Sequence, residues 1–229
     1  TAEFIAETLQ DILQEARKLN PGFLQSKTGF IVKTTLTFPR DWGLGTSSTL
    51  VNNIAQWAAI DAYQLLQNSF SGSGYDIANA QHNLPILYQL KNKKPLIKTV
   101  DFSPQFSDQL YFVYLNKKQN SREGIAKYKE NNDDFKNEIH RISEISLEMC
   151  SVKSLLDFER LIEEHEQIIA SIIKLKPVKE LLFPDYLGAI KSLGAWGGDF
   201  VLVTGNKSTL QYFKEKGYET ILSYSDMIL

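Results

Sequence analysis

The segment from Phe38 to Trp57 constrains the fold of this chain more than any other stretch. A β-branched run ends at Pro39, the sequence then reads GLGTSST from Gly43 to Thr49, and an amphipathic helical pattern follows. Glycines let a backbone approach an anion closely. The unpaired N–H groups of a first helical turn and the helix dipole both favour negative charge there. The segment therefore predicts a strand, a turn and a helix start that could hold phosphate.

The hydroxyl residues of this turn leave its role open. No lysine follows the last glycine, so the segment does not have the Walker pattern. Ser47, Ser48 and Thr49 could cap the helix, contact a phosphate oxygen or reach a magnesium ion. A glycine-rich turn before a helix can equally be plain structure, and both interpretations stay open at this point.

Composition and charge exclude several classes of protein. The 229 residues are 43% hydrophobic and 23% charged, which fits a globular chain of one or two domains that buries a sizeable core. A net charge of −2 argues against nucleic acid as the main partner. The apolar runs are too short to cross a bilayer, and residues 1–20 read as an acidic amphipathic helix rather than a signal peptide. We therefore expect a cytoplasmic protein with no nucleic-acid and no membrane partner.

Cysteine and histidine give no sign of a metal site. The single cysteine, Cys150, excludes an internal disulfide and fits a small buried hydrophobe better than a catalytic thiol. The three histidines, His82, His140 and His165, are scattered and lack the spacing of metal ligands.

Periodicity predicts alternating helices and strands. Helical spacing is found over residues 4–20, 50–66 (about five turns of helix), 75–81, 121–128, 139–149, 154–175 and 209–216. Strand patterns are found over residues 29–38, 85–90, 96–102, 109–115, 189–193, 200–204 and 219–222, with a lysine-rich hairpin tip at 91–94. A polar stretch at 103–107 suggests two domains, residues 1–105 and 106–229. The order of elements favours an α+β architecture with two lobes.

Two further motifs accompany the first. The sequence SGSGYDIA places Asp76 directly after a glycine loop, and GAWGGD, from Gly194 to Asp199, forms a third glycine-rich turn between predicted strands. Each has a structural explanation by itself. Asp76 could simply favour a helix dipole, and the last turn could need positive φ.

The order of these three motifs resembles that of the GHMP kinase superfamily, which includes galacto-, homoserine, mevalonate and phosphomevalonate kinases. The first block looks like the family's phosphate-binding GLGSSA motif, the second like the GSGFD form of phosphomevalonate kinases, and the third like the C-terminal GAGGGG motif. GSGYDIA together with GAWGGDF also resembles a bacterial branch named for its GYDIA signature. The resemblance spans residues 29 to about 205.

The resemblance implies an α+β, two-lobed fold. Its N-terminal lobe would be like domain 2 of ribosomal protein S5, and its C-terminal lobe would be ferredoxin-like. It implies Asp76 beside the acceptor hydroxyl, as a general base or an electrostatic positioner, and Ser47 near magnesium. The residues implied around ATP are Gly43, Leu44, Gly45, Thr46, Ser47 and Ser48. Those implied around the substrate are Gly74, Tyr75, Arg122, Gly194, Ala195, Gly197 and Gly198.

The sequence also departs from the family pattern. The first family motif, near PGK…GEY, is not found, so we expect an incomplete N-terminal lobe with unpaired strands and part of the nucleotide pocket missing. Trp196 and Asp199 stand where the family has small residues. The acid that completes the magnesium site is not evident, since the nearest candidate, Asp61, lies too early in the predicted helix.

The sequence thus predicts an ATP- and Mg²⁺-dependent kinase that transfers the γ-phosphoryl group to a small acidic metabolite, with mevalonate or phosphomevalonate favoured. The alternative is a non-catalytic nucleotide- or metabolite-binding protein on the same scaffold. A structural α+β protein with incidental glycine turns is a third interpretation. The oligomeric state stays open, a homodimer included.

Overall fold

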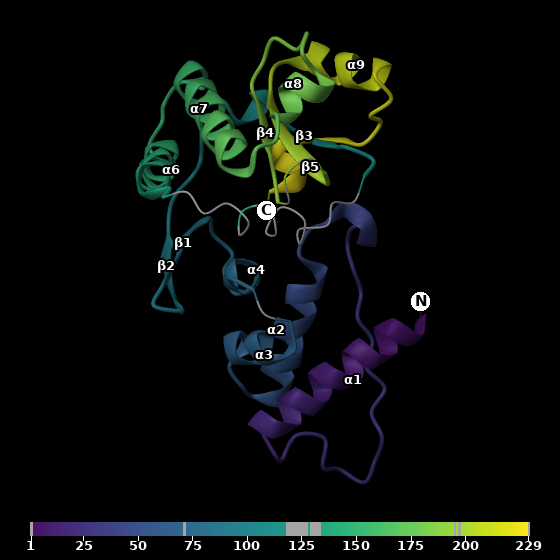
Figure 1. Ribbon diagram of the computed structural model, residues 1–229. Helices are drawn as coiled ribbons and strands as arrows, with labels where there is room; N and C mark the ends of the chain where they lie inside the picture. The colour runs from purple at the N-terminus through teal and green to yellow at the C-terminus, as the bar shows by residue number, and fades with distance from the viewer. Residues whose placement is uncertain are drawn as a thin grey trace. The chain divides into compact units, whose positions relative to one another are not determined.

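The structure, a computed structural model, describes residues 2–70, 72–117, 128, 134–194, 196 and 198–228. The chain forms two compact units, which we describe separately (Figure 1). The first unit comprises Thr1–Thr37 and Leu44–Val100, and the second comprises Phe38–Gly43 and Asp101–Leu229.

Helices form the core of the first unit. They are α1 (Ala2–Leu19), α2 (Thr46–Ala58), α3 (Ala62–Ser69) and α4 (Tyr75–Ala80). The apolar stripe of α1, which includes Ile12 and Ala16, packs with Val51, Leu65 and Ile77 in one buried cluster. The helical spacing of these residues brings them to one face of each helix, so the predicted N-terminal helix and the short helix at Tyr75 are confirmed.

The predicted five-turn helix after the glycine loop is wrong, because the chain breaks it into α2 and α3. Ala59 adopts φ 53°, and the Ile60 and Ala59 amides donate to the carbonyls of Ala55 and Gln56, the two bonds of a Schellman motif. Asp61 then caps α3 by accepting hydrogen bonds from the amides of residues 63 and 64 at 2.7 and 3.1 Å. The helical spacing of apolar residues continues across this break, so the sequence pattern did not indicate the break.

A hairpin completes the first unit. Strands β1 (Ile86–Lys91) and β2 (Lys94–Thr99) pair antiparallel from Ile86↔Thr99 to Lys91↔Lys94. Asn92 and Lys93 form the turn with φ 50° and 62°, as a two-residue type I′ turn requires. The predicted lysine-rich hairpin tip is confirmed, with its outer lysines paired within the strands.

The predicted strand over residues 29–38 is not formed. Residues 29–36 belong to no helix or strand, and the side chains of Phe30, Ile31 and Val32 are 54%, 91% and 60% exposed. The Phe30 ring contacts Trp57 edge to face at a centroid distance of 5.7 Å. β-branched residues favour extended backbone, but a strand also needs a neighbour to pair with, and none of the described strands pairs with this segment.

The second unit is built on an antiparallel sheet. Its described strands are β3 (Leu110–Tyr114), β4 (Ile190–Ser192), β5 (Phe200–Thr204) and β6 (Ile221–Ser223), in the order β4-β5-β3-β6. The central strands β3 and β5 are buried along their whole length, and Val113 pairs with Val201. All four strands lie close to the positions that the sequence predicts.

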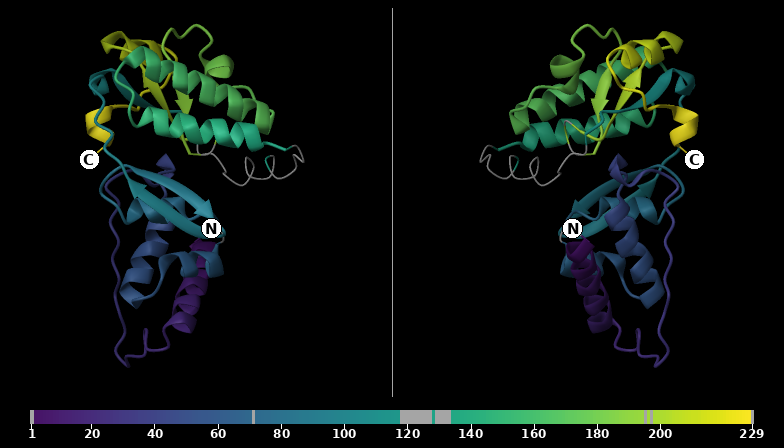
Figure 2. Two further views of the ribbon diagram at one scale, coloured as in Figure 1. Left: turned by 90° about the vertical axis from the view of Figure 1, so that its left-hand side faces the viewer. Right: turned by 90° about the vertical axis from the view of Figure 1, so that its right-hand side faces the viewer.

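Helices cover this sheet. The longer ones are α6 (Lys136–Met149), α7 (Leu155–Ile173) and α9 (Lys207–Glu215), and the short ones are α8 (Val178–Leu182) and α10 (Tyr224–Met227). Figure 2 shows α6 and α7 side by side, where Arg141 binds Glu164 through Nη2 and Oε2 at 2.8 Å. Alternate residues of β3 and β5 pack with Phe183 and Phe213 in one buried cluster. The short helices escaped the sequence analysis because they are too short to show periodicity. Most of the predicted helix at 121–128 lies outside the described residues.

Candidate functional site

The glycine-rich loop leads into the start of α2. Gly43 and Gly45 both have φ 69°, a conformation that glycine adopts without strain. The amide and hydroxyl of Thr49 donate to the Gly45 carbonyl at 3.0 and 3.1 Å, which closes the first turn. No described side chain caps this helix. The amides of Thr46, Ser47 and Ser48 precede the first intrahelical donor and are open to an anion.

Asp76 lies beside this helix start, within the first unit. A Cβ placed on Gly45 would be 3.6 Å from Cγ and Oδ1 of Asp76, so the carboxylate is in contact range of the loop. Burial raises the pKa of the Asp76 carboxyl group, and a hydrogen bond with the Tyr75 side chain lowers it to a smaller extent. The first unit thus brings together a helix start that favours anions and a carboxylate with enhanced proton affinity.

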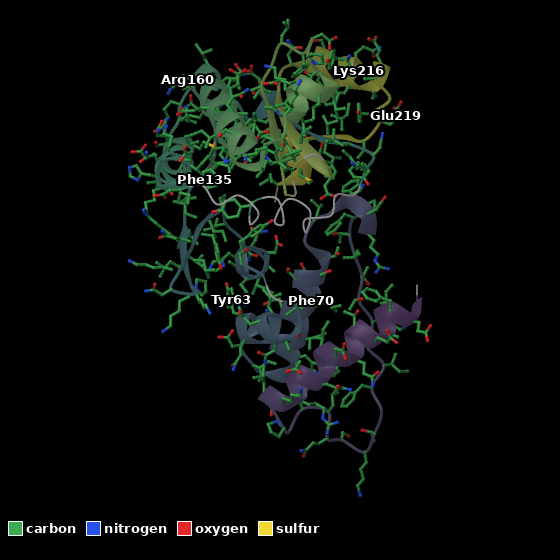
Figure 3. All side chains as sticks on the ribbon, viewed as in Figure 1. Tyr63, Phe70, Phe135, Arg160, Lys216 and Glu219 are labelled. Carbon is green, nitrogen blue, oxygen red and sulfur yellow. The ribbon has the colours of Figure 1, made fainter. Side chains whose placement is uncertain are left out.

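Two tyrosines hold the loop that carries Asp76. The hydroxyl of Tyr88, on β1, donates a hydrogen bond to the Ser73 carbonyl. A Cβ on Gly74 would lie 2.9 Å from Cδ1 of Tyr63 and 3.4 Å from the Tyr88 hydroxyl, and Gly74 has φ 82°. Tyr63 is on α3 (Figure 3), and burial raises the pKa of both tyrosines. We call these contacts of Tyr63 and Tyr88 with Ser73 and Gly74 the tyrosine clamp. The sequence analysis did not predict the clamp, and the glycine before Tyr75 was the only sign of it.

The α4 helix is fixed to α2 by a polar contact. Gln81 Nε2 donates to Oδ1 of Asn52 at 2.9 Å, and Asn52 is buried. Ile77 and Ala78 of α4 are both fully buried. Because buried polar groups need partners, this bond helps to fix the distance between the start of α4 and α2.

In the second unit, the carboxylate of Asp199 lies against Gly43. A Cβ on Gly43 would lie 2.3 Å from Cγ of Asp199, so only glycine fits there without a shift. Asp199 is 8% exposed and has φ 54°, and its backbone bonds with Lys117 and Leu115 continue the pairing of β3 with β5. A buried acid therefore lies at the first glycine of the loop, where it opposes the approach of an anion.

The residues before Gly43 belong to the second unit. They form a short 3₁₀ turn, Arg40–Trp42, whose Trp42 ring lies 5.2 Å from the ring of Phe200 between centroids. The Tyr114 hydroxyl donates to the Asp41 carbonyl at 3.2 Å. The glycine-rich loop is thus the stretch in which the chain passes from one unit to the other. No sequence pattern indicated this packing.

The other predicted site residues are distributed over both units. Gly74, Tyr75 and Asp76 are in the first unit, and Gly194 and Gly198 are in the second, where Gly194 has φ 61°. Arg122, Ala195 and Gly197 lie outside the described residues. Sequence reasoning placed all of them in one site, and this placement stays a prediction.

The part of the chain that the structure describes holds no group of three or more His, Cys, Asp or Glu side chains arranged to bind a metal ion. The hydroxyl-bearing Ser47 is exposed at the start of α2, and Leu44, Thr46 and Ser48 are half-buried. None of the described helices combines the length and apolar character needed to span a bilayer.

Comparison with known proteins shows a fold relationship. No protein-family model matches the sequence, and no curated protein matches it. A Lin0012 protein from Listeria innocua aligns with a TM-score of 0.65 and 16% identity, over 93% of this chain and 77% of its own. L. major mevalonate kinase, solved in complex with R-mevalonate, aligns with a TM-score of 0.56 and 16% identity, over 96% of this chain and 77% of its own. The chain therefore has a mixed α/β fold similar to that of mevalonate kinase, and the predicted combination of helices and sheets is confirmed at this level.

Proposed function

We propose that this chain is an ATP-dependent kinase of the GHMP type that phosphorylates a small acidic metabolite in the cytoplasm, with mevalonate or phosphomevalonate as the favoured acceptor. One observation carries the proposal: within the first unit, the Asp76 carboxylate lies against Gly45, at the open start of α2. Phosphoryl transfer depends on positioning and charge stabilisation, for which an anion cradle next to one carboxylate is well suited. The likeness in fold to mevalonate kinase supports the same class.

The helix start would hold the nucleotide. The amides of Gly45, Thr46 and Ser47 would donate to phosphate oxygens of ATP, and Gly43, Leu44 and Ser48 would complete the loop. The exposed Ser47 hydroxyl could add one oxygen ligand to magnesium, whose remaining ligands would come mainly from the phosphates. When bound, Mg·ATP supplies the phosphoryl group.

Asp76 would act on the acceptor. Its carboxylate would accept the proton of the acceptor hydroxyl as that oxygen is phosphorylated, or orient the hydroxyl by a hydrogen bond. The raised pKa caused by burial suits the first role. Tyr63 and Tyr88 would keep the carboxylate in place through the contacts at Gly74 and Ser73.

The finer assignments belong to the same proposal. Along the second unit, β3 is followed by helices, then by β4 and β5, then by α9 and β6, and the sheet order is β4-β5-β3-β6. This arrangement supports a ferredoxin-like C-terminal lobe. The first unit would correspond to a lobe of the ribosomal protein S5 domain 2 type. The GSGYDIA and GAWGGDF sequences favour the GYDIA branch, and Gly194, Ala195, Gly197, Gly198 and Arg122 would contact the substrate.

The test is turnover of Asp76→Asn with Mg·ATP and an acceptor panel of mevalonate, phosphomevalonate and homoserine, measured as ADP release. We expect a loss of about 10²–10⁴-fold in kcat, because the proton acceptor is removed while shape is kept. Asp11→Asn, which changes an exposed acid on α1 of the same unit, should leave the rate unchanged. Near-wild-type turnover of Asp76→Asn would refute the catalytic role.

The second candidate is a non-catalytic nucleotide- or metabolite-binding protein on this scaffold. The observation that favours it is the buried Asp199 carboxylate against Gly43, which opposes phosphate at that end of the loop. Calorimetry with Mg·ATP, followed by the acceptor panel, separates the two functions. Nucleotide binding without transfer to any acceptor would favour the second candidate. If the carboxylate weakens nucleotide binding, Asp199→Asn should strengthen it.

A further inference from the structure

The β1–β2 hairpin of the first unit carries a concentration of positive charge that the proposed reaction does not use. Four exposed lysines lie within eight residues of the chain, at Lys91, Lys93, Lys94 and Lys98. No acid occurs between residues 77 and 100, although the chain as a whole has a net charge of −2. The hairpin is therefore a positive feature on a protein that is otherwise negative.

The strand register places three of these lysines on one face of the hairpin, which we call the lysine face. Residues directly opposite each other in an antiparallel pair point to the same side, and the sides alternate along a strand. The pairs of the lysine face are Leu87↔Lys98, Gln89↔Leu96 and Lys91↔Lys94. On the other face, Tyr88 is half-buried and its hydroxyl reaches the Ser73 carbonyl, so that face is turned toward the rest of the unit. The lysine face is the one that meets solvent.

The charges of the lysine face do not stabilise the fold. Lys91 and Lys94 are directly opposite each other, and like charges in that position destabilise a sheet. None of the ion pairs between described residues involves a hairpin lysine. Figure 1 shows α1, which carries most of the acids of this unit, on the opposite side of the unit from the hairpin. Within the described residues the repulsion is uncompensated, and an anionic partner would relieve it.

Exposed leucines accompany the lysines. Leu90, just before the turn, is 43% exposed, and Leu96, just after it, is 49% exposed. At the surface of a bilayer, leucine side chains can leave water at the boundary with the acyl chains, while lysine ammonium groups stay beside the lipid phosphates. A turn that combines both residue types fits an anionic membrane surface.

Other anionic partners fit this face less well. Single-stranded nucleic acid is held by aromatic side chains that stack on the bases, and the only ring in the two strands, that of Tyr88, is on the opposite face. Protein partners are commonly anchored by aromatic residues and arginine, and the lysine face has neither. Lysine is a point charge that demands no fixed geometry of its partner, as suits a fluid array of headgroups.

We propose that the β1–β2 hairpin docks the protein on an anionic membrane surface, with its four lysines beside lipid phosphates and Leu90 and Leu96 at the acyl boundary. Docking of this kind needs no membrane-spanning helix. It differs from the expectation of no membrane partner, which rested on the lack of an apolar run long enough to cross a bilayer. Each lysine near an anionic leaflet strengthens binding about fivefold. The docking surface is independent of the proposed kinase reaction.

The test is sedimentation of the full chain with vesicles of phosphatidylcholine, either alone or mixed with phosphatidylserine. The protein should bind the anionic vesicles at least about tenfold more tightly than the neutral ones, because only the former attract the lysines. Raising NaCl from about 0.1 M to about 1 M shortens the screening length from about 10 Å to about 3 Å and should release most of the bound protein. Equal binding to both kinds of vesicle, binding to neither, or tighter binding to oligo(dT) or polyglutamate than to the anionic vesicles would overturn the proposal.

Matched variants locate the docking surface. Lys91→Gln combined with Lys94→Gln removes two charges and should weaken binding to anionic vesicles about 30-fold. Lys207→Gln combined with Lys214→Gln makes the same change of charge at exposed positions of α9 and should leave binding unchanged. Equal losses for the two double variants would mean that net charge alone drives binding, and would contradict the assignment to the hairpin.

Two further variants separate docking from folding and from charge. Lys94→Glu places an acid opposite Lys91, so it should weaken binding about 30-fold without lowering the urea midpoint of the protein. Leu90→Ser combined with Leu96→Ser keeps every charge and should weaken vesicle binding about tenfold. Unchanged vesicle binding of either variant would refute the proposed contact with the membrane.

Discussion

Substitution of Gly74 by alanine should destabilise the first unit more than backbone strain alone predicts. Gly74 has φ 82°, and an alanine in this left-handed region costs about 1–2 kcal/mol. The added Cβ would also lie 2.9 and 3.0 Å from Cδ1 and Cε1 of Tyr63, and overpacking of this kind costs about 1–3 kcal/mol. The expected total for Gly74→Ala is about 2–5 kcal/mol.

Gly217 provides a matched control for the backbone. It has φ 86°, and a Cβ there would meet no atom within 4 Å, so Gly217→Ala should lose only the strain of about 1–2 kcal/mol. Urea unfolding followed by circular dichroism gives both losses as midpoint shifts multiplied by the m-value. The Tyr63→Leu background shortens the opposing side chain and should reduce the cost of Gly74→Ala. Equal losses for the two alanine variants would refute the steric argument and, with it, the tyrosine clamp.

Two further predictions concern acids of the first unit. Burial raises the folded-state pKa of Asp76 above its usual value of 3.8, so the ionised carboxylate destabilises the fold at neutral pH, and Asp76→Asn should raise the urea midpoint at pH 7. That gain should vanish below the unfolded pKa, where both states are protonated, and a gain independent of pH would contradict the argument. Asp61→Ala removes the cap of α3 and should cost about 1 kcal/mol, whereas Asp11→Ala, in the exposed face of α1, should cost almost nothing in the same unfolding assay.

The sequence predicted those elements whose local signals and tertiary environment agree. The α7 helix has a long apolar stripe and a Ser154 cap that accepts a hydrogen bond from the Asp157 amide at 3.1 Å. β3 is a continuous apolar run, as expected of a strand buried on both faces. In both cases the same residues that favour the local conformation also fill the core, so pattern and packing lead to one answer.

The errors arose where a local preference met a non-local requirement. Residues 29–38 have strong β propensity, but pairing depends on a neighbour that propensity does not encode. The helical spacing of apolar residues continues through Ala59 and Ile60, although the helix ends there. The Asp61 side chain accepts hydrogen bonds from the first amides of α3, so a new helix begins. Caps of this kind can be read from a sequence only as candidates.

The motifs of the candidate site were identified from the sequence, and Asp76 lies beside Gly45 in the structure. The roles of these residues stay predictions. The contacts of Tyr63 and Tyr88 with the Asp76 loop, and of Asp199 with Gly43, join residues far apart in the chain. Single-residue patterns carry no information on such pairs, which is why sequence reasoning could not find them.

The exposed segment at residues 29–36 has a consequence for the protein in solution. Its backbone amide and carbonyl groups and its apolar side chains are exposed, and Lys33 is the only charged residue among them. The same segment of another copy of the chain could pair with it as a β-strand through backbone hydrogen bonds. Self-association of this kind grows with protein concentration, so crowding would favour assemblies that a dilute sample does not contain.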